Sequence, residues 1–298
     1  MSLSITDLNV WIGDAHILRG ITLEVPDGQH VGIIGSSGSG KSMLSLAIMG
    51  LLPEGARVEG SIRWNGRELV GDSERELRSL RGSQISMMFQ DPATSLDPLM
   101  RLGKQIALPL RRHRGLRGAA LREAIDRALA EVALPDPARI ARSFPYEVSG
   151  GQRQRVALAM TLAASPSLLI ADEPTTALDV TVQRTVLDLL DAVTRERGVS
   201  LLFISHDLPV VARMADRVIV VDAGRITDDV PVEVIRTAPD MLSDSARSIA
   251  SAARALDSVF ERIGAVRPDS QPGHAPGEAG ECEGEPASST DNEGNAHE

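Results

Sequence analysis

Cysteine is almost absent from this sequence, since Cys282 is the single one among 298 residues. One cysteine forms neither an intrachain disulfide framework nor a cysteine-ligated metal cluster, and its scarcity fits a reducing, cytosolic compartment. Long apolar runs are also missing, because no stretch approaches the roughly 18 to 20 residues that span a bilayer. The amino terminus, MSLSITDLNV, has no basic region followed by an apolar one, so no signal peptide is expected. If the protein serves a membrane, other chains must cross it.

Basic runs are equally scarce, and the longest is Arg111-Arg112-His113-Arg114, which is expected to be a solvated loop. The formal net charge is −10. Residues 264–298 contain eight acidic residues and one arginine, a net charge of −7, which leaves only about −3 for the rest of the chain. Such a nearly balanced body gives little support for a nucleic-acid partner, and none is expected.

The composition is that of an ordinary globular protein, with 42% hydrophobic and 24% charged residues. Alternating apolar residues predict strands over 3–10 and 17–25. Short apolar runs rich in β-branched residues predict buried strands at 30–34, 168–171, 200–204 and 217–221. Helical patterns lie at 42–52, 152–164 and 182–197. This alternation of helix and buried strand favours an α/β fold with a mainly parallel sheet covered by helices.

Three further segments differ in character from this α/β pattern. Within a main domain predicted over 1–230, the stretch from about 91 to 149 is expected to be an inserted helical subdomain. Its clearest signal is an apolar face formed by Leu121, Ile125, Leu129 and Val132. Weaker helical patterns over 231–262 predict a carboxy-terminal helical extension. The acidic segment 263–298 is expected to be disordered, because it has too little apolar surface to offset its ordering entropy.

A phosphate-binding loop follows the strand predicted at 30–34. The residues match the pattern GxxxxGK followed by Ser or Thr: Gly35, Ser36, Ser37, Gly38, Ser39, Gly40, Lys41 and Ser42. Glycines let backbone N–H groups converge on phosphate oxygens, and the following helix adds the positive end of its dipole. Lys41 is expected to reach the β and γ phosphates, and the Ser42 hydroxyl to bind Mg²⁺. The alternative, a glycine–serine turn that arose by chance, does not account for the complete pattern between strand and helix.

Two carboxylates, Asp172 and Glu173, end the apolar strand predicted at 168–171. Open α/β sheets bind ligands at the carboxyl ends of their strands. Asp172 suits a contact to Mg²⁺, directly or through water, and Glu173 suits a general base that polarises the attacking water. A solvated acidic strand end is the alternative, but together with the phosphate loop the pair predicts a nucleoside triphosphatase.

A third motif narrows the class of nucleotide-binding protein. Val148-Ser149-Gly150-Gly151-Gln152 resembles the LSGGQ signature of ABC ATPases, with Val in place of the leading Leu. Small residues at a helix start expose N–H groups to an anion. In that family two ATPase subunits pack head to tail, and each signature closes over the nucleotide of the partner. The resemblance therefore implies a functional dimer, formed with a second copy or with a paralogue.

The remaining motifs occur in the order that this family has. Gln90, in MMFQDP, resembles the Q-loop glutamine that contacts Mg²⁺ and water, so that the family's magnesium contacts fall on Ser42, Gln90 and Asp172. Asp179, in Ala-Leu-Asp, resembles the D-loop aspartate. His206, in ISHD, occupies the switch-histidine position and would contact the γ phosphate, although a histidine after a strand is often only structural.

Three longer stretches resemble the ATPases of peptide and nickel importers: FQDPATSLDP at 89–98, SFPYE at 143–147 and DEPTTALDVTVQ at 172–183. The resemblance extends over about 3–228. It implies a P-loop NTPase (RecA-like) core of the ABC ATPase type with an amino-terminal antiparallel β subdomain and an inserted α-helical subdomain. The implied function is that of the ATP-hydrolysing subunit of an importer for peptides or nickel and metal chelates, with ATP and Mg²⁺ as cofactors. The implied partners are the second ATPase subunit, two transmembrane permease subunits and an extracytoplasmic substrate-binding protein, and the implied location is the cytoplasmic face of the inner membrane, as a peripheral protein.

The sequence also departs from the family pattern in two places. An aromatic residue that stacks on adenine usually precedes the glycine at Gly13, but here Ile12 precedes it and Trp11 comes before that. Either Trp11 stacks from a shifted position or stacking is weak, and a buried Trp11 is the alternative. The His-Pro-Tyr-containing segment of the importer group is not recognisable after 230, and Cys282 alone excludes the cysteine cluster of some relatives.

Two other functions compete with the importer ATPase. ABC-type proteins that act on DNA or ribosomes usually carry two ATPase cores or long coiled-coil insertions, and this chain has one core and an insertion of ordinary size. A nucleotide-binding regulatory subunit with little hydrolysis is the second alternative. The presence of Glu173 and His206 argues against it, whereas the unusual adenine-stacking position favours it.

Overall fold

In the computed structural model, the described residues are 1–89, 95–175 and 180–251. Two sheets organise them. The first is antiparallel, with strand order β2-β1-β4-β5. Its strands are β1 (Leu3–Ile12), β2 (Ala15–Val25), β4 (Ala56–Trp64) and the short β5 (Arg67–Glu68). β1 lies between β2 and β4, and its apolar residues Leu3, Ile5, Leu8 and Val10 are all buried.

The second sheet has six strands in the order β10-β9-β3-β8-β7-β6. The strands are β3 (His30–Ile34), β6 (Ile85–Met88), β7 (Leu168–Asp172), β8 (Ser200–Ile204), β9 (Arg217–Asp222) and β10 (Arg225–Pro231). All pairings are parallel except that of β10 with β9. β3, β7 and β8 are buried along their whole length, which explains their continuous apolar sequences.

The two faces of this sheet belong to different cores. Successive residues of β7 point to opposite faces of the sheet. Leu168 and Ile170 pack in the core shared with the antiparallel sheet and helix α1 (Lys41–Met49), whereas Leu169 and Ala171 pack in the core on the opposite face. Helices α7 (Gly150–Leu162), α8 (Val180–Glu196) and α9 (Leu208–Met214) cover that opposite face. A layer therefore covers each face, as expected for an α/β fold. Helix α2 (Glu74–Leu80) connects the antiparallel sheet to β6, and its start is fixed by a capping box.

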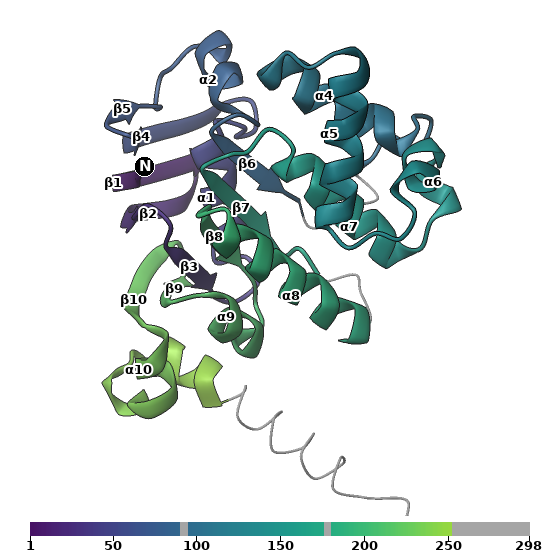
Figure 1. Ribbon diagram of the computed structural model, residues 1–298. Helices are drawn as coiled ribbons and strands as arrows, with labels where there is room; N and C mark the ends of the chain where they lie inside the picture. The colour runs from purple at the N-terminus through teal and green to yellow at the C-terminus, as the bar shows by residue number, and fades with distance from the viewer. Residues whose placement is uncertain (90–94, 176–179, 252–298) are drawn as a thin grey trace, which may run out of the picture. The chain divides into compact units, whose positions relative to one another are not determined.

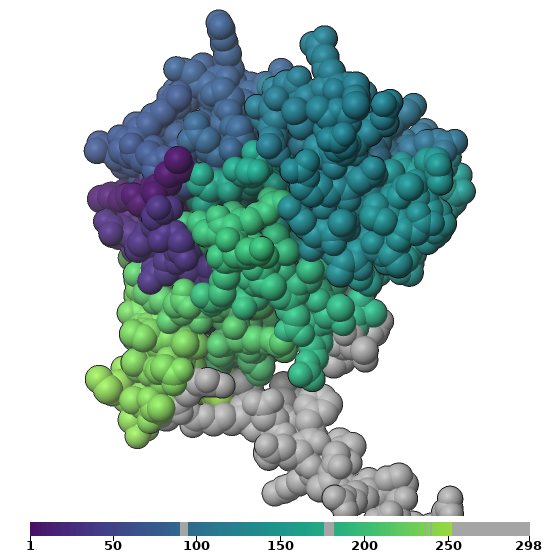
Figure 2. Space-filling view, in the orientation of Figure 1, coloured from purple at the N-terminus to yellow at the C-terminus, as the bar shows by residue number. Residues whose placement is uncertain are grey.

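A group of helices lies between β6 and α7: α4 (Leu102–Arg114), α5 (Gly118–Glu131), α6 (Pro137–Arg142) and the 3₁₀ turn η1 (Pro145–Glu147). Figure 1 shows them clustered beside α7, and their residues form one teal lobe in Figure 2. Leu121, Leu129 and Val132 are buried, in agreement with the predicted apolar face. The prediction of a loop at Arg111–Arg114 was wrong, because these residues form the last turn of α4. Basic side chains suit that position, since the carboxyl end of a helix is the negative end of its dipole.

The chain continues past β10 through α10 (Val232–Thr237), the 3₁₀ turn η2 (Pro239–Met241) and helical residues 244–251. Ile235, Leu242, Ala246 and Ala250 are buried against the helical core. The predicted extension over 231–262 is therefore described only as far as 251, and the predicted disordered tail, 263–298, lies outside the described residues. Among the described helices, none combines the length and the apolarity that crossing a bilayer requires.

Candidate functional site

The phosphate loop connects β3 to α1, as the sequence predicts for 35–42. Gly35 contacts the end of β9 so closely that a Cβ atom there would lie 2.1 Å from the Val221 carbonyl oxygen. Gly40 caps α1 with φ 105°, a left-handed conformation that favours glycine. The glycines are thus required by the tight turn itself, and the turn aims the amino terminus of α1 at the loop.

Lys41 is buried, and its Nζ donates hydrogen bonds to the carbonyl oxygens of Gly35 and Ser36, both at 2.8 Å. Burial lowers the pKa of Lys41, although the Glu173 and Asp172 carboxylates act in the opposite direction. The ammonium group is therefore held inside the loop by backbone oxygens. A phosphate oxygen would be a stronger, charge-assisted partner for it.

Asp172 ends β7 beside α1. The Ser45 hydroxyl donates to its Oδ2 at 3.1 Å, and Ser42 also hydrogen-bonds the carboxylate. Its Oδ1 is buried and has no hydrogen-bond partner among the described residues. Burial raises the pKa of Asp172, with the neighbouring Glu173 acting in the same direction. A buried carboxylate oxygen without a partner, next to a serine hydroxyl, has the chemistry of a cation site.

These groups fit Mg²⁺, with Ser42 and Asp172 as its protein contacts. The described residues contain no cluster of three or more His, Cys, Asp or Glu side chains that could hold a metal alone. Mg²⁺ usually takes one or two protein carboxylates and completes its octahedron with waters and substrate phosphates. The two protein contacts are therefore typical of a site in which waters and the phosphates of a bound nucleotide supply the remaining ligands of the metal.

Glu173 and His206 face each other across the end of the sheet. The Glu173 backbone N–H donates to the Ile204 carbonyl at 2.8 Å, and the residue has φ 47°, an unusual conformation for a glutamate. Its Oε1 lies 3.1 Å from Nδ1 of His206. Both side chains line a pocket of about 620 Å³ together with Lys41 and Ser42. The structure thus places the predicted base and the predicted switch histidine beside the phosphate loop.

The signature residues lie elsewhere. Ser149 caps α7: its Oγ accepts from the Gln152 N–H at 3.3 Å, and the Gln152 side chain accepts from the Ser149 N–H at 3.0 Å. A Cβ on Gly150 would meet only the end of Arg153 at 3.8 Å, whereas one on Gly151 would lie 2.6 Å from Val182. None of residues 149–152 lines the pocket beside the phosphate loop.

Trp11 lies in β1 between its cross-strand neighbours His16 on β2 and Arg57 on β4. The His16 ring stacks on the indole with centroids 4.3 Å apart, and the Arg57 guanidinium lies 4.0 Å from the indole centroid. The neighbours come from opposite sides of the strand, so both faces of the Trp11 ring are covered. Neither Trp11 nor Ile12 lines the pocket beside the phosphate loop.

Ile17 and Met43 line the same pocket but do not belong to the predicted site. Ile17 belongs to the alternating pattern of β2, and that pattern indicates strand packing rather than ligand contact. Two predicted site residues, Gln90 and Asp179, lie outside the described residues.

Comparison with known proteins decides the family. The ABC transporter family profile matches residues 18–176. The chain belongs to the ABC transporter family. Its fold is that of an ABC ATPase cassette, and the predicted fold class is thereby confirmed.

The relatives found among characterised proteins carry peptide-transport names. The oligopeptide transport ATP-binding protein OppD of Salmonella typhimurium is 46% identical over 227 residues, which cover 75% of this chain and 68% of OppD. OppD of Bacillus subtilis is 46% identical over 225 residues, 75% of this chain and 63% of that protein. The dipeptide transport ATP-binding protein DppD of Bacillus subtilis is 42% identical over 232 residues, 76% of this chain and 69% of that protein. The predicted resemblance to the peptide-importer ATPases is confirmed.

Solved structures agree with this assignment. The ABC transporter cassette MJ0796, solved as a dimer, has a TM-score of 0.66 at 29% identity and covers 77% of this chain and 98% of its own. CbiO1 from Clostridium perfringens, part of an ABC transporter complex, has a TM-score of 0.69 at 25% identity and covers 89% of this chain and 97% of its own.

Proposed function

We propose that this chain is the ATP-hydrolysing subunit of an ABC importer for peptides. The observation that carries the proposal is the single pocket lined by Lys41, Ser42, Glu173 and His206, with the buried carboxylate of Asp172 beside it. The peptide-transport names of the relatives support the cargo class. Nickel or metal chelates are the alternative cargo.

Each side chain has a distinct part in hydrolysis. Lys41 exchanges its two backbone acceptors for oxygens of the β and γ phosphates. Glu173 orients the attacking water and accepts its proton, and the contact with His206 fixes the carboxylate while the imidazole faces the γ phosphate. Mg²⁺ bound by Ser42 and Asp172 would neutralise charge on the phosphates.

The signature position supports a dimer as the active unit. The amino terminus of α7 is a ready anion site that the pocket beside the same chain's phosphate loop does not include. In a head-to-tail pair each α7 faces the nucleotide of the other subunit, whether that subunit is a second copy or a paralogue. The dimeric structure of the related cassette MJ0796 is consistent with this arrangement.

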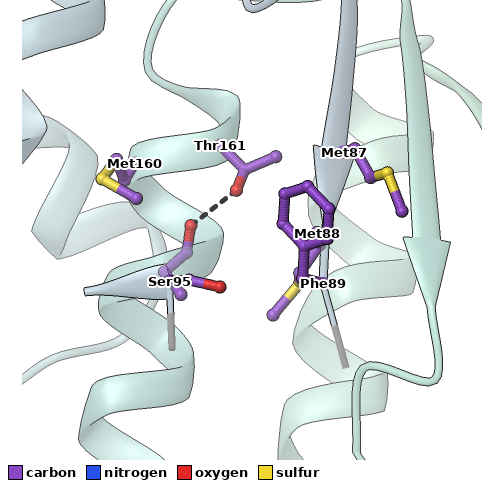
Figure 3. Close-up of a pocket in the computed structure, with 7 residues that line it drawn as sticks. Met87, Met88, Phe89, Ser95, Met160 and Thr161 are labelled. Atoms are coloured by element: carbon purple, nitrogen blue, oxygen red, sulfur yellow. Dashed lines mark hydrogen bonds between the residues drawn. The ribbon is translucent and has the colours of Figure 1, made fainter. Parts of the chain in front are cut away.

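A second pocket, of about 470 Å³, suits a permease segment. Figure 3 shows its lining where β6 ends and α7 passes: Met87, Met88, Phe89, Ser95, Ala157, Met160 and Thr161. Phe89 is 42% exposed although it is a large apolar residue. Methionine side chains adapt to varied partner surfaces, so this pocket, called the methionine pocket here, fits an apolar anchor of a transmembrane subunit. Such docking would hold the chain at the cytoplasmic face of the membrane.

ATP hydrolysis by the purified chain, compared with Glu173→Gln, tests the central proposal. We expect the wild type to hydrolyse ATP and Glu173→Gln to lose roughly 100-fold or more of this activity, because a positioned base typically contributes that much. Size-exclusion chromatography with ATP and Mg²⁺ should show the variant accumulating as a dimer. A wild-type chain that neither hydrolyses ATP nor dimerises contradicts the proposal and favours a regulatory subunit.

The methionine pocket is tested by Met160→Asp, with Leu99→Asp as the control. Leu99 is 87% exposed and does not line the pocket, so its substitution adds the same charge elsewhere on the surface. We expect Met160→Asp to lose co-purification with the permease subunits while the ATPase activity of the isolated chain persists. Equal co-purification of both variants would show that the permease docks somewhere else.

A further inference from the structure

A small cavity of about 160 Å³ lies at the joint between the helical subdomain and the ATPase core, apart from both pockets described above. The end of α4 and one face of α5 form one side. Ala163, just after α7, and Arg197, just after α8, form the other. Figure 1 shows α4, α5 and α7 side by side in this region. We refer to this cavity as the joint cavity.

Arg197 already binds residues on both sides of the joint cavity. Its Nη1 donates to the Leu162 carbonyl at 2.9 Å, and its Nη2 forms an ion pair with Glu131 of α5. A second arginine bridges the same two parts nearby, because Arg155 of α7 donates to the Ala133 carbonyl at 3.0 Å. The walls of the joint cavity therefore hold together without a ligand.

Two other arginines of the joint cavity, Arg114 and Arg127, have no hydrogen bond or ion pair with any described residue. Glu123, which also lines the cavity, is likewise without a partner in the part of the chain that the structure describes. The floor between them is apolar, with Leu110, Ala128 and Ala163 buried. Two exposed arginines and one exposed glutamate, none of them paired with a described residue, thus border one small space that also has buried apolar lining residues.

This combination selects a class of ligand. Guanidinium groups bind carboxylates in planar, bidentate geometry. A free glutamate beside them offers an acceptor to an ammonium group and repels a second negative charge, which disfavours a phosphate dianion. We propose that the joint cavity binds a small zwitterion, a free amino acid or a dipeptide. Its α-carboxylate lies on Arg114 and Arg127, its ammonium group lies on Glu123, and a short side chain packs on the apolar floor.

Such a ligand acts where the two parts of the cassette meet. A molecule that fits one relative orientation of α5 and the core better than others shifts the population towards that orientation. Binding is therefore coupled to ATP hydrolysis through the orientation of the helical subdomain. The last step, and only this step, rests on the proposed function. If the chain energises a peptide importer, amino acids and dipeptides released from imported cargo are the natural ligands, and the site senses the product of transport.

Isothermal titration calorimetry of the full chain without nucleotide tests the binding itself. Dialanine and leucine are the probes. Two analogues serve as comparisons: dialanine amide, which lacks the carboxylate, and N-acetyl-dialanine, which lacks the ammonium group. We expect saturable millimolar binding of dialanine or leucine and at least roughly 10-fold weaker binding of both analogues, because each lost charged hydrogen bond costs about that factor. Binding of the amide as tight as that of dialanine, tighter binding of inorganic phosphate, or no binding of any probe overturns the proposal.

Matched variants locate the site. Arg127→Gln should weaken dialanine binding at least roughly 10-fold, whereas Arg122→Gln, an exposed arginine of the same helix that does not line the cavity, should leave it unchanged. Glu123→Gln should weaken dialanine binding but leave N-acetyl-dialanine binding unchanged. Equal effects of Arg127→Gln and Arg122→Gln contradict the assignment. Because no readout requires ATP turnover, failure here is separable from failure of the proposed ATPase function.

Discussion

At the scale of single residues, Asp172, which we propose as a contact of Mg²⁺, combines burial with a carboxylate oxygen left unsatisfied by the described residues. Its carboxylate is buried, one oxygen has no partner among the described residues, and burial raises its pKa. A raised pKa means that the ionised form is disfavoured in the folded state, so the charge destabilises the fold wherever the carboxylate is ionised. Strained or unsatisfied groups of this kind are typical of functional sites.

Asp172→Asn should therefore stabilise the protein and impair its activity. Asparagine has nearly the same shape but no charge, so we expect the free energy of unfolding at pH 7 to rise by about 1 kcal/mol. The Mg²⁺-dependent ATPase activity should fall at least roughly 10-fold, because the metal loses an anionic contact. Thermal unfolding without nucleotide and an ATPase assay measure the two effects. Glu54→Gln, at an exposed position, is the control, and a lower melting temperature for Asp172→Asn would contradict this account.

The site residues predicted from sequence are those whose role depends on local chemistry. Lys41, Asp172, Glu173 and His206 come from three separate segments, yet each lies at or after the carboxyl end of a buried strand of the six-stranded sheet, and the carboxyl ends of its parallel strands meet at one edge. Trp11 is different, because its surroundings depend on strand pairing. Arg57 covers it from β4, a strand that the sequence analysis did not predict, so the cover of the ring could not be foreseen.

At the scale of elements, three of the strands predicted from short apolar runs have a common property. β3, β7 and β8 are buried on both faces, so their sequences are continuous apolar runs. Four of the described strands were missed: β4, β5, β6 and β10. Of these, β4 and β10 lie largely exposed and carry charged residues such as Arg57, Glu59 and Asp229, whereas β6 is mostly buried but only four residues long. None of the β10 residues is fully buried, and its only partner in the sheet is β9. An edge strand such as β10 is held by backbone pairing, and its side chains give little signal.

The packing of α7 on α8 predicts different effects for substitutions at the two signature glycines, one on stability and the other on dimer formation. A Cβ on Gly151 would lie 2.6 Å from Val182 of α8, whereas one on Gly150 meets nothing closer than 3.8 Å. Gly151→Ala should thus lower the free energy of unfolding by about 1 to 3 kcal/mol, through overpacking, and lower activity as a consequence. Gly150→Ala should leave the melting temperature nearly unchanged. It should nevertheless prevent the ATP-dependent dimer, because the added methyl group occupies space that a partner's phosphate would need.

Thermal unfolding and size-exclusion chromatography of the two variants, each in the Glu173→Gln background, separate these effects. Two equally stable variants would show that α7 and α8 can separate at little cost. A Gly150→Ala protein that still dimerises with ATP would show that the signature does not approach a partner's nucleotide closely.

At the scale of the whole molecule, His30 links several elements at the end of the parallel sheet opposite to the nucleotide pocket. It begins β3 and is fully buried. Its Nδ1 lies 3.2 Å from the Met214 carbonyl of α9 and 3.5 Å from Oδ1 of Asp191 in α8. Arg195 of α8 bridges Asp191 and Asp216, at 2.8 Å and 3.1 Å. The Nε2 atom of His30 has no hydrogen-bond partner in the described ranges.

Burial lowers the pKa of His30, and the positive charge of Arg195 acts in the same direction. The carboxylates of Asp216 and Asp191 and the backbone contact with Met214 oppose this shift but do not reverse it. The imidazole is therefore neutral in the folded protein at pH values where it is already protonated in the unfolded chain. Below about pH 6.5 the unfolded state then binds a proton that the native state does not, so acidification favours unfolding.

The free energy of unfolding should consequently fall as the pH drops below about 6.5, with His30 contributing up to about 1.4 kcal/mol per pH unit. His30→Gln should reduce that slope between pH 6.5 and the lowered pKa of the native histidine, although it loses some stability at pH 7 from altered packing. Urea unfolding at several pH values measures the slope for both proteins, and His30→Asn provides a second neutral side chain if glutamine does not fit. Parallel pH profiles for wild type and variants would mean that His30 takes up its proton without unfolding. In that case the Asp191–Arg195–Asp216 cluster must rearrange to accommodate a second positive charge, and the ion pair that joins Arg195 of α8 to Asp216, the residue before β9, would be the part of the molecule that responds to pH.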